Sequence, residues 1–427
     1  MSNITLDGLP LKTGTVSDAG IVHYRESGVD KKLTISDLIA KFLANNPKLS
    51  SIEALSSIAN LLSLAGLNGS ANKIAYFNGV GSMALADLQP NRNAIINGDF
   101  NVWQRGTSFT SVADGTYVAD RWFYSKISSA VHDITLSSDV PTVAQAGRLF
   151  KNSLKADCQT VDSSIVSGDL VRISQRIEGF NWLPLAQRTI TLSFWVKATK
   201  TGIYCVSLGN SGADRSYVAE YTVNASNTWE FKTITFTASP SAGTWNYENG
   251  VGLALTFTLA SGSTFQTTKD TWQTGSFFAT ANQVNACDST SNDFFIAGVQ
   301  LEAGSVATPF EYRTVQQELS LCERYFEKSY DYSQYAGAIT TTGMIQERVA
   351  GSSLNITVSF RSIKRTAPSV VFYNPITGTA GEARNFSQGI NIAFTAFNIN
   401  DKAFLTDRND LTDNNQYGWH FYANAEL

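Results

Sequence analysis

Apolar and polar residues alternate along much of the chain, and this pattern predicts β-strands. In the run ITLSFWVKA, apolar side chains occupy every second position and therefore one face: Ile190, Leu192, Phe194, Val196 and Ala198. Thr191, Ser193 and Lys197 occupy the other face. GVGLALTFTLASG (250–262) repeats the alternation, and WEFKTITFTAS (229–239) and FFIAGVQLEAG (294–304) predict further strands. Turn-forming clusters separate these runs, so residues 91–313 are expected to form an antiparallel β-sandwich.

The period changes to that of a helix after residue 313. Val315, Leu319, Cys322 and Phe326 are spaced four, three and four residues apart, and Thr314 with Gln317 forms a capping box. Residues 314–330 are therefore predicted to be an amphipathic helix that links two domains. Alternating runs return at 354–362, 368–378, 390–399 and 418–427. They predict a second, smaller sandwich over residues 331–427.

Residues 1–90 show helical periodicity. LTISDLIAKFLANN (33–46) carries an apolar stripe, and SSIEALSSIANLLSLAG (50–66) starts with a capping box and places Ile52, Leu55 and Leu62 on one side. NKIAYFNGVGSMALADLQP (72–90) predicts a Gly-rich connector. The stripe at 52–62 needs cover, either from a neighbouring domain or from identical chains in a short helical bundle. Leu319 and Phe326 of the linking helix are candidates for contacts of the same kind.

The predicted fold is thus mainly β, with two antiparallel, jelly-roll-like β-sandwiches, a short helical N-terminal region (1–90) and a linking helix. Composition narrows the class of protein. Charged residues make up 16% of the 427 residues, and the net charge of −4 leaves no basic face for a nucleic acid. Neither a signal peptide nor an apolar stretch of about 18 residues is recognised, so we expect no membrane span and synthesis in a cytoplasm.

Residues that could carry catalysis or bind a metal are sparse. The three histidines are isolated, no nucleophile-elbow motif occurs, and GVGSM at 79–83 lacks the lysine of a phosphate-binding loop. The four cysteines, Cys158, Cys205, Cys287 and Cys322, have no CxxC spacing, so buried free thiols are expected. Asp99 and Asp293 could meet around a calcium ion, although two turn carboxylates are the simpler reading. An enzyme and a cofactor are therefore not expected.

Aromatic residues on predicted loops are the stronger candidates for function. Trp182, Trp245, Tyr247 and Trp272 each lie beside Asn, Gln, Asp or Glu residues. Sugar rings stack their apolar C–H faces on such aromatics, while their hydroxyl groups require polar partners. The same aromatics could instead support the ends of the sandwich or lie in an interface between chains.

The stretch NAIINGDFNVWQRG (93–106) contains two turn signals and buried-looking aromatics but no catalytic spacing. It is predicted to be the first strand of the sandwich, with Asn97-Gly98 as its turn. Trp103 and Trp122 are expected in the core or at a sheet edge.

An ordered series of motifs resembles the tail-fibre and receptor-binding family of tailed bacteriophages. The series is NRNAIINGDFNVWQRGTS, TYVADRWFY, LSFWVKA, WQTG, GVQLEAGSVATPFEYR and LCERYFEKSY, between residues 91 and 330. GTVSDAGIVHYRESGVDKKLTISDLIA (14–40) is similar to the N-terminal attachment segments of that family. The resemblance implies a carbohydrate-binding-module-like sandwich, a homotrimer in the virion tail, other tail proteins as partners of the N-terminal region, and a host surface polysaccharide or lipopolysaccharide as receptor. It transfers no catalytic or sugar-contacting residue.

Three functions follow as hypotheses. The first is a short tail fibre that binds a host glycan, because the chain lacks a long fibre shaft. The second is a purely structural tail, baseplate or collar protein that binds other virion proteins. The third is a polysaccharide depolymerase, since two carboxylates at a suitable separation cannot be recognised from sequence.

Overall fold

A computed structural model describes residues 92–427, apart from 350, 352–353, 409–410 and 412–413, together with the backbone of four strands before residue 88. The chain divides into two compact units, Met1–Leu88 and Gln89–Leu427, and each is described by itself.

The first unit contains two antiparallel hairpins. β1 (Ile21–Glu26) pairs with β2 (Val29–Thr34), and β3 (Lys73–Gly79) pairs with β4 (Ser82–Asp87). The stretch predicted to be an irregular connector is therefore a hairpin, because short β-prone runs flank a Gly-rich reversal. β2 also takes the first two residues of the predicted helix at 33–46. Ile52, Leu55 and Leu62 lie outside the described residues.

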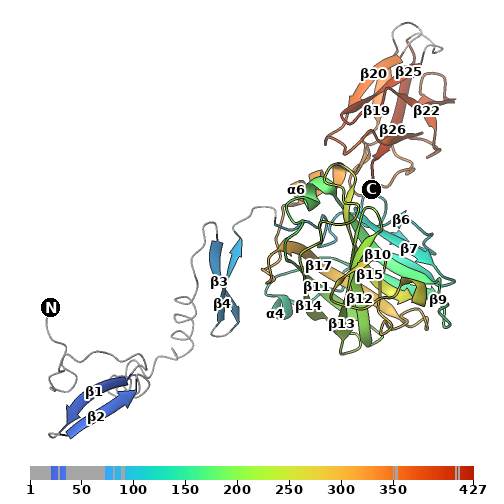
Figure 1. The fold of residues 1–427 in the computed structure, drawn as a ribbon. Helices are drawn as coiled ribbons and strands as arrows, with labels where there is room; N and C mark the ends of the chain where they lie inside the picture. Colours follow the sequence, from blue (N-terminus) through green and yellow to red (C-terminus); the bar gives the residue numbers. More distant parts are fainter. Residues whose placement is uncertain are drawn as a thin grey trace, which may run out of the picture. The chain divides into compact units, whose positions relative to one another are not determined.

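Two antiparallel sheets form the sandwich in the second unit, as the alternation predicted (Figure 1). The seven-stranded sheet has the order β16 (Trp272–Thr274), β13 (Arg215–Val223), β12 (Gly202–Asn210), β15 (Val251–Ser261), β10 (Leu170–Glu178), β7 (Trp122–Ile127) and β6 (Thr116–Tyr117). The six-stranded sheet has the order β14 (Glu230–Phe236), β11 (Ile190–Ala198), β17 (Asp293–Ala303), β9 (Ser153–Thr160), β8 (Val131–Ser137) and β5 (Ser108–Phe109). Two one-turn helices, α4 (Val143–Ala146) and α5 (Gly179–Trp182), and a 3₁₀ turn (Ser263–Phe265) lie between strands.

The core of the sandwich consists of the inward faces of both sheets. All five apolar positions of the alternating run 190–198 belong to it, as do Leu253, Leu255, Phe257 and Leu259 of β15. Trp103 and Trp122 are 4% and 0% exposed, so their predicted core placement is confirmed. The four cysteines are free and buried, which confirms that prediction too.

A long loop covers part of the outer face of the seven-stranded sheet. Phe277 and Ala279 pack on Cys205 of β12 and Val218 of β13. The hydroxyl group of Thr258 donates a hydrogen bond of 2.7 Å to the carbonyl oxygen of Phe278. The loop therefore shields part of this face from ligands.

The stretch 93–106 is not a strand, so that part of the prediction was wrong, whereas the predicted turn at Asn97-Gly98 is present, with the Phe100 N–H donating to the Asn97 carbonyl oxygen at 3.2 Å. It is an irregular segment that is mostly buried, with Asn97 in the left-handed region at φ 57°. The Asn97 side chain makes the hydrogen bonds that a neighbouring strand would otherwise provide. Its Nδ2 donates to the carbonyl oxygens of Val102 (2.8 Å) and Asp120 (3.1 Å), and its Oδ1 accepts from the Val102 N–H (2.9 Å). Asparagine tolerates this backbone region because its short side chain bonds locally.

The linking helix is shorter than predicted. α6 covers Val315–Glu323 with the predicted capping box at Thr314 and Gln317, and Phe326 then lies in strand β18 (Phe326–Lys328). β18 pairs with β26 (Gln416–Asn424), so pairing to a distant strand overrides the helical period beyond Glu323. Leu319 packs on a cluster that includes Ile96, Val102 and Tyr325.

Phe326 is also buried, at 3% exposure. Phe326 and, in part, Leu319 are therefore covered within the chain, whereas Val315 at the start of the predicted stripe is 62% exposed.

The C-terminal region has its own sheets and core. β26 is the central strand: β18, β19 (Ile345–Arg348), β21 (Ser369–Tyr373) and β22 (Glu382–Asn385) pair with it, and β23 (Ile390–Ala393) pairs with β22. A three-stranded sheet contains β20 (Leu354–Ser359), β25 (Ala403–Arg408) and β24 (Ala396–Phe397). Phe372, Phe404 and Trp419 are buried in the core of this region. The strands predicted around 354–362, 368–378, 390–399 and 418–427 are all present.

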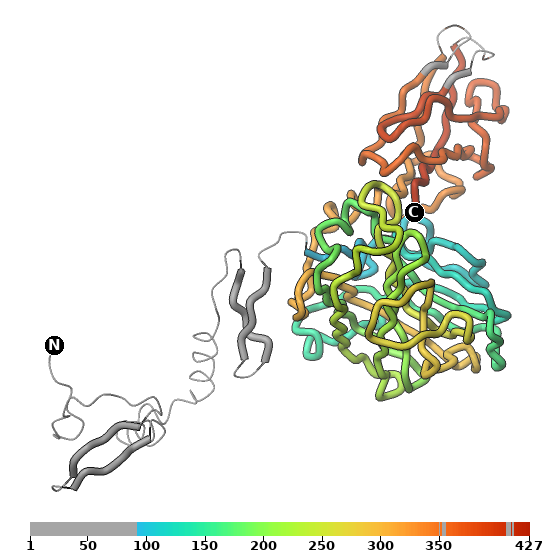
Figure 2. The backbone as a smooth tube through the Cα atoms, in the orientation of Figure 1, coloured from blue at the N-terminus to red at the C-terminus, as the bar shows by residue number. Residues whose placement is uncertain are grey.

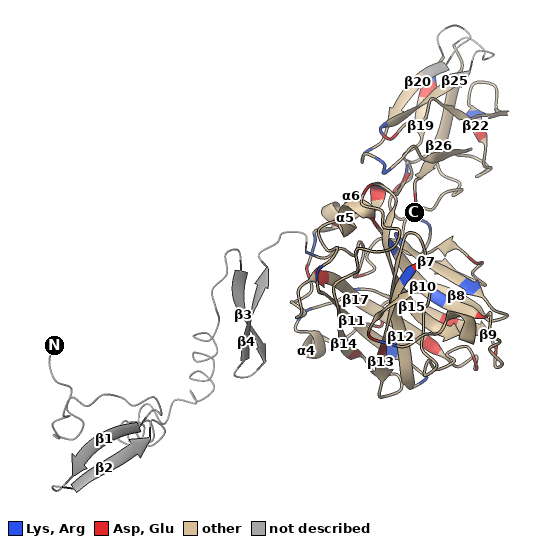
Figure 3. Ribbon diagram, in the orientation of Figure 1, with Lys and Arg blue, Asp and Glu red and all other residues tan. Residues whose placement is uncertain are grey.

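Ion pairs join the C-terminal region to the sandwich. Glu178, 1% exposed, accepts hydrogen bonds from Arg324 (2.6 and 2.8 Å) and from the hydroxyl group of Tyr325 (2.5 Å). The end of the chain returns to this junction (Figure 2), where Glu426 pairs with Arg105 and Arg121. Elsewhere on the drawn strands, basic and acidic positions are interspersed (Figure 3).

Candidate functional site

The structure brings together three of the four aromatic residues that the sequence suggested for sugar binding. The rings of Trp182 and Trp245 are stacked, with centroids 5.5 Å apart at an interplanar angle of 21°. The rings of Trp245 and Trp272 meet edge to face, with centroids 5.7 Å apart at an interplanar angle of 73°. The tryptophans come from α5, the loop 237–250 and β16, which are far apart in sequence.

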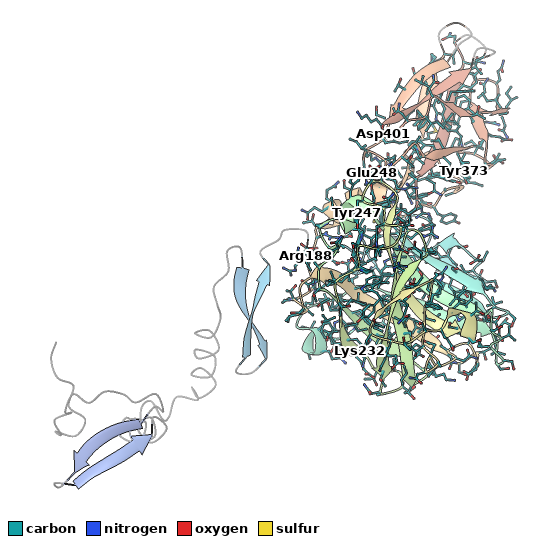
Figure 4. All side chains as sticks on the ribbon, viewed as in Figure 1. Arg188, Lys232, Tyr247, Glu248, Tyr373 and Asp401 are labelled. Atoms are coloured by element: carbon teal, nitrogen blue, oxygen red, sulfur yellow. The ribbon has the colours of Figure 1, made fainter. Side chains whose placement is uncertain are left out.

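Much of this aromatic cluster is engaged in packing. Trp182 is 0% exposed, so it cannot contact a sugar from solvent, and its assignment to the site was wrong. The indole N–H groups of Trp245 and Trp272 already donate to the carbonyl oxygens of Ala242 (3.0 Å) and Thr237 (3.1 Å). Tyr247, labelled in Figure 4, is half-buried against the core. Sugar binding by Trp245, Tyr247 and Trp272 stays a prediction, and their clear role is to support one end of the sandwich.

Asp99 and Asp293 are not neighbours. The carbonyl oxygen of Gly98 accepts from the N–H of Val299, and Val299 lies six residues along β17 from Asp293, about 20 Å in an extended strand. Asp293 pairs with Lys155 at 3.0 Å, whereas Asp99 accepts from the amide of Asn101. The calcium site considered from the sequence is therefore not formed. In the described part of the chain, no group of three or more His, Cys, Asp or Glu side chains is placed to hold a metal ion.

An open groove lies instead on the outer face of the six-stranded sheet. Its floor includes Phe231 on β14 and Trp195 on β11, which face each other in cross-strand register. The rings of Trp195 and Phe231 have centroids 5.2 Å apart, and Phe231 is 48% exposed because β14 is an edge strand. Lys232, labelled in Figure 4, is the next residue of this edge strand.

Trp195 packs beside a small apolar cluster on the same face of the sheet. Trp229, Phe295 and Ala297 are buried on the same face and pack against Trp195. The indole N–H of Trp229 donates 2.8 Å to Asp139, which also pairs with Lys197. These contacts restrict the Trp195 ring, and such a restriction reduces the entropic cost of binding.

Two segments form the walls of the groove. One wall is α4 with the residues that follow it, Gly147, Arg148 and Phe150, and the other is the turn Thr308–Phe310. The rings of Phe150 and Phe310 meet edge to face, with centroids 5.5 Å apart. Gly298, at the register shift of β17, lets Phe150 approach, because a Cβ there would lie 2.7 Å from the Phe150 ring.

The turn that forms the second wall is anchored by one buried carboxylate. Glu302, 2% exposed, accepts hydrogen bonds from the backbone N–H (2.8 Å) and the hydroxyl group (2.6 Å) of Thr308. The side-chain amide of Gln300 donates to the same carboxylate at 2.8 Å. These bonds hold Thr308 and Phe310 in place at the rim.

The groove has a volume of about 320 Å³ and combines aromatic surface with polar groups. Its four aromatic residues are Phe150, Trp195, Phe231 and Phe310, and its polar residues include Gln145, Arg148, Ser193 and Thr308. This combination of apolar ring faces and a few polar side chains is typical of sites for small organic ligands, including sugars.

A larger hollow of about 440 Å³ lies between α5, α6 and residues 92–96. Phe180 is its only aromatic residue among those described, and Arg313 in its wall is committed to ion pairs with Glu311 and Glu318. The hollow offers no aromatic platform.

His132 is buried between two side chains of the sandwich. His132 lies between the hydroxyl group of Tyr124 (2.8 Å from Nδ1) and the thiol of Cys287 (3.9 Å from Nε2), and is 2% exposed. Burial lowers the pKa of His132 to about 4 and raises the pKa of the Cys287 thiol. A substrate in solvent cannot reach this group.

Among the described residues, no helix combines the length and apolar character needed to cross a bilayer.

The groove residues were not predicted from the sequence, although two of them stand out in its alternating pattern. Trp195 falls on the otherwise polar face of the alternating run 190–198, and Phe231 falls on the exposed side of the next run. An aromatic residue at a position that should face solvent needs a reason. Phe150, Arg148 and Phe310 could not be found this way, because only the fold brings their loops together.

Comparisons with known proteins add a fold likeness. No family model matches the chain, and no curated protein does either. Among solved structures, a CBM4 module is 16% identical over 49% of this chain and 98% of its own, with a TM-score of 0.27. The family 11 carbohydrate-binding module from Clostridium thermocellum, in complex with a β-1,3-1,4-mixed-linked tetrasaccharide, is 11% identical over 48% and 99%, with a TM-score of 0.27. TmCBM61 in complex with β-1,4-galactotriose is 11% identical over 50% and 100%, with a TM-score of 0.26. Likenesses at these TM-scores identify no ligand for this chain.

Proposed function

We propose that this chain is a glycan-binding protein without catalytic activity, and that the groove on the six-stranded sheet is its binding site. The observation that carries the proposal is the cross-strand pair Trp195–Phe231, which lies open at the floor of a groove with polar groups along its rim. Each sugar ring has an apolar face that can cover an aromatic ring and hydroxyl groups that can bond to the rim.

The size of the expected effect follows from the contact area. A sugar that covers about 100 Å² of apolar ring surface gains about 2.5 kcal/mol, at roughly 25 cal/mol per Å². That gain corresponds to a factor of roughly 50–100 in affinity. Truncating Trp195 should therefore remove most of the binding.

We further propose that the chain is a short tail fibre of a tailed bacteriophage. The ordered motif series between residues 91 and 330 supports this role. In it, residues 1–90 bind other tail proteins, the chain assembles as a homotrimer in the virion tail, and the groove binds a surface polysaccharide or lipopolysaccharide of the host. A purely structural virion protein and a depolymerase are the competing functions.

The test compares glycan binding by the full chain and by three single variants, one of which is a control. We expect Phe231→Ala, and more strongly Trp195→Ala, to weaken binding to a panel of bacterial surface polysaccharides. The matched control is Phe397→Ala, because Phe397 is 47% exposed, close to the 48% of Phe231, but lies on β24 of the C-terminal region. Equal affinity of all variants would place the site elsewhere, and binding of no glycan would favour the structural role. Shortened polysaccharide after incubation would favour the depolymerase.

A further inference from the structure

Arg148 at the rim of the groove has an unusual environment. Its guanidinium carbon lies 4.9 Å from the ring centroid of Phe150, 5.0 Å from that of Phe310 and 5.4 Å from that of Tyr312. One terminal nitrogen donates 3.2 Å to the carbonyl oxygen of Phe310. These rings hold the long side chain in place.

No carboxylate within the described residues is close enough to Arg148 to form an ion pair. Two carboxylates next to the wall segment are engaged elsewhere: Glu302 binds Thr308 and Gln300, and Glu311 binds the backbone N–H of Asn93 and pairs with Arg313. Asp99 feels the charge of Arg148 without forming an ion pair with it; its Oδ2 accepts from Asn101, its Oδ1 has no partner, and burial raises its pKa. Arg148 also has a buried Nε–H without a hydrogen-bond partner.

Arginines of the same unit differ in this respect, and Arg172, which lies over the Phe278 ring, resembles Arg148 in having a buried Nε–H without a partner. Arg121, Arg313 and Arg324 each pair with a glutamate of the same chain. A positioned guanidinium without a carboxylate is suited to accept one from a ligand, in the paired geometry that arginine and carboxylates favour.

We infer that the glycan bound in the groove is acidic, and that a sugar carboxylate, such as that of a uronic acid, pairs with Arg148. This inference rests on the proposed function and names the ligand class of the same site. One sugar ring stacks on Trp195, and the exposed amide of Gln145 at the rim donates only one long bond of 3.4 Å, to the carbonyl oxygen of Trp229, so its second N–H can reach a sugar hydroxyl group.

The test compares an acidic bacterial polysaccharide with the same polymer after its carboxyl groups have been reduced to alcohols. We expect the wild-type chain to bind the acidic form about tenfold more tightly or better, since a charge-assisted pair is worth at least that factor. Arg148→Gln should bind both forms equally and at the level of the reduced form. Arg148→Lys should keep part of the preference, and this variant also covers the case in which Arg148→Gln does not fold.

Lys151→Gln is the matched control, because Lys151 is an exposed cation three residues from Arg148 but is not part of the groove. It should keep the full preference for the acidic form. The inference fails if Arg148→Gln keeps the preference for the acidic form. It also fails if the wild type binds the acidic and the reduced polymer equally well. In the second case, loss of binding in Trp195→Ala would show that the proposed function still stands. If no polymer binds the wild type, both fail.

Discussion

Gly298→Ala tests how the sheet and the groove depend on one residue. Gly298 has φ +58°, and a Cβ added there would lie 2.7 and 2.9 Å from two atoms of the Phe150 ring. The left-handed backbone costs about 1–2 kcal/mol for alanine. Displacing Phe150, which is only 4% exposed, adds about 1–3 kcal/mol of overpacking. We therefore expect the free energy of unfolding to fall by about 2–5 kcal/mol.

The control for this prediction is Gly115→Ala. Gly115 has φ +72°, and a Cβ there would meet nothing within 4 Å, so the variant carries the backbone cost alone. Denaturant unfolding followed by tryptophan fluorescence measures both free energies. The excess loss in Gly298→Ala should be about 1–3 kcal/mol. Glycan affinity should fall as well, because Phe150 forms a wall of the groove. Equal losses in the two variants would refute the proposed contact with Phe150.

Three further predictions concern stability. Because the folded chain holds His132 neutral down to about pH 4 whereas the unfolded chain protonates it near 6.5, stability should fall as the pH drops from about 6.5 toward 4. Urea titrations should show that the free energy of unfolding of the wild type falls by about 2 kcal/mol more than that of His132→Gln between pH 7 and 5. The same dependence on pH in both proteins would contradict this. Lys364→Met should lower the free energy of unfolding by about 3 kcal/mol, because it leaves Glu327 as a buried carboxylate without its ion-pair partner. In a double-mutant cycle, adding Glu327→Leu should restore part of that loss. Additive losses would argue against coupling of the two residues. Trp272→Ala should lower the melting temperature, measured by calorimetry, because the ring supports Trp245 and Tyr217; an unchanged value would mean that the cluster does not support the sandwich.

The alternation of the sequence was sufficient to predict the sandwich. Every inward position of the run 190–198 is in the core, because a side-chain period of two places alternate residues on opposite faces of a strand. The capping box at Thr314 likewise marks the start of α6. Such signals are local, and the fold preserves them.

The predictions failed where a distant contact decides the local structure. Phe326 continues a helical period, yet pairing with β26 makes it part of a strand. The stretch 93–106 has the composition of a strand, but the side chain of Asn97 bonds to backbone groups in its place. Trp182 lies near a predicted loop, yet it packs under Trp245 and is fully buried.

The groove shows the same limit for the candidate site. Trp195 and Phe231 could be recognised as aromatics on the polar side of two strands. Their pairing, and the approach of Arg148 and Phe310 from loops more than a hundred residues apart, depends on the register of β11, β14 and β17 and on the turn held by Glu302. No spacing in the sequence encodes that register.

The most direct measurement of the central proposal is inhibition of phage adsorption by the soluble full chain, with the double variant Trp195→Ala/Phe231→Ala beside it. Both proteins are added to a panel of candidate host bacteria before the phages that infect them. We expect the wild type to block adsorption on at least one host and the double variant, at equal folded concentration, to leave adsorption unchanged. Equal inhibition by the two proteins, or no inhibition by the wild type on any host, would contradict glycan binding through this groove.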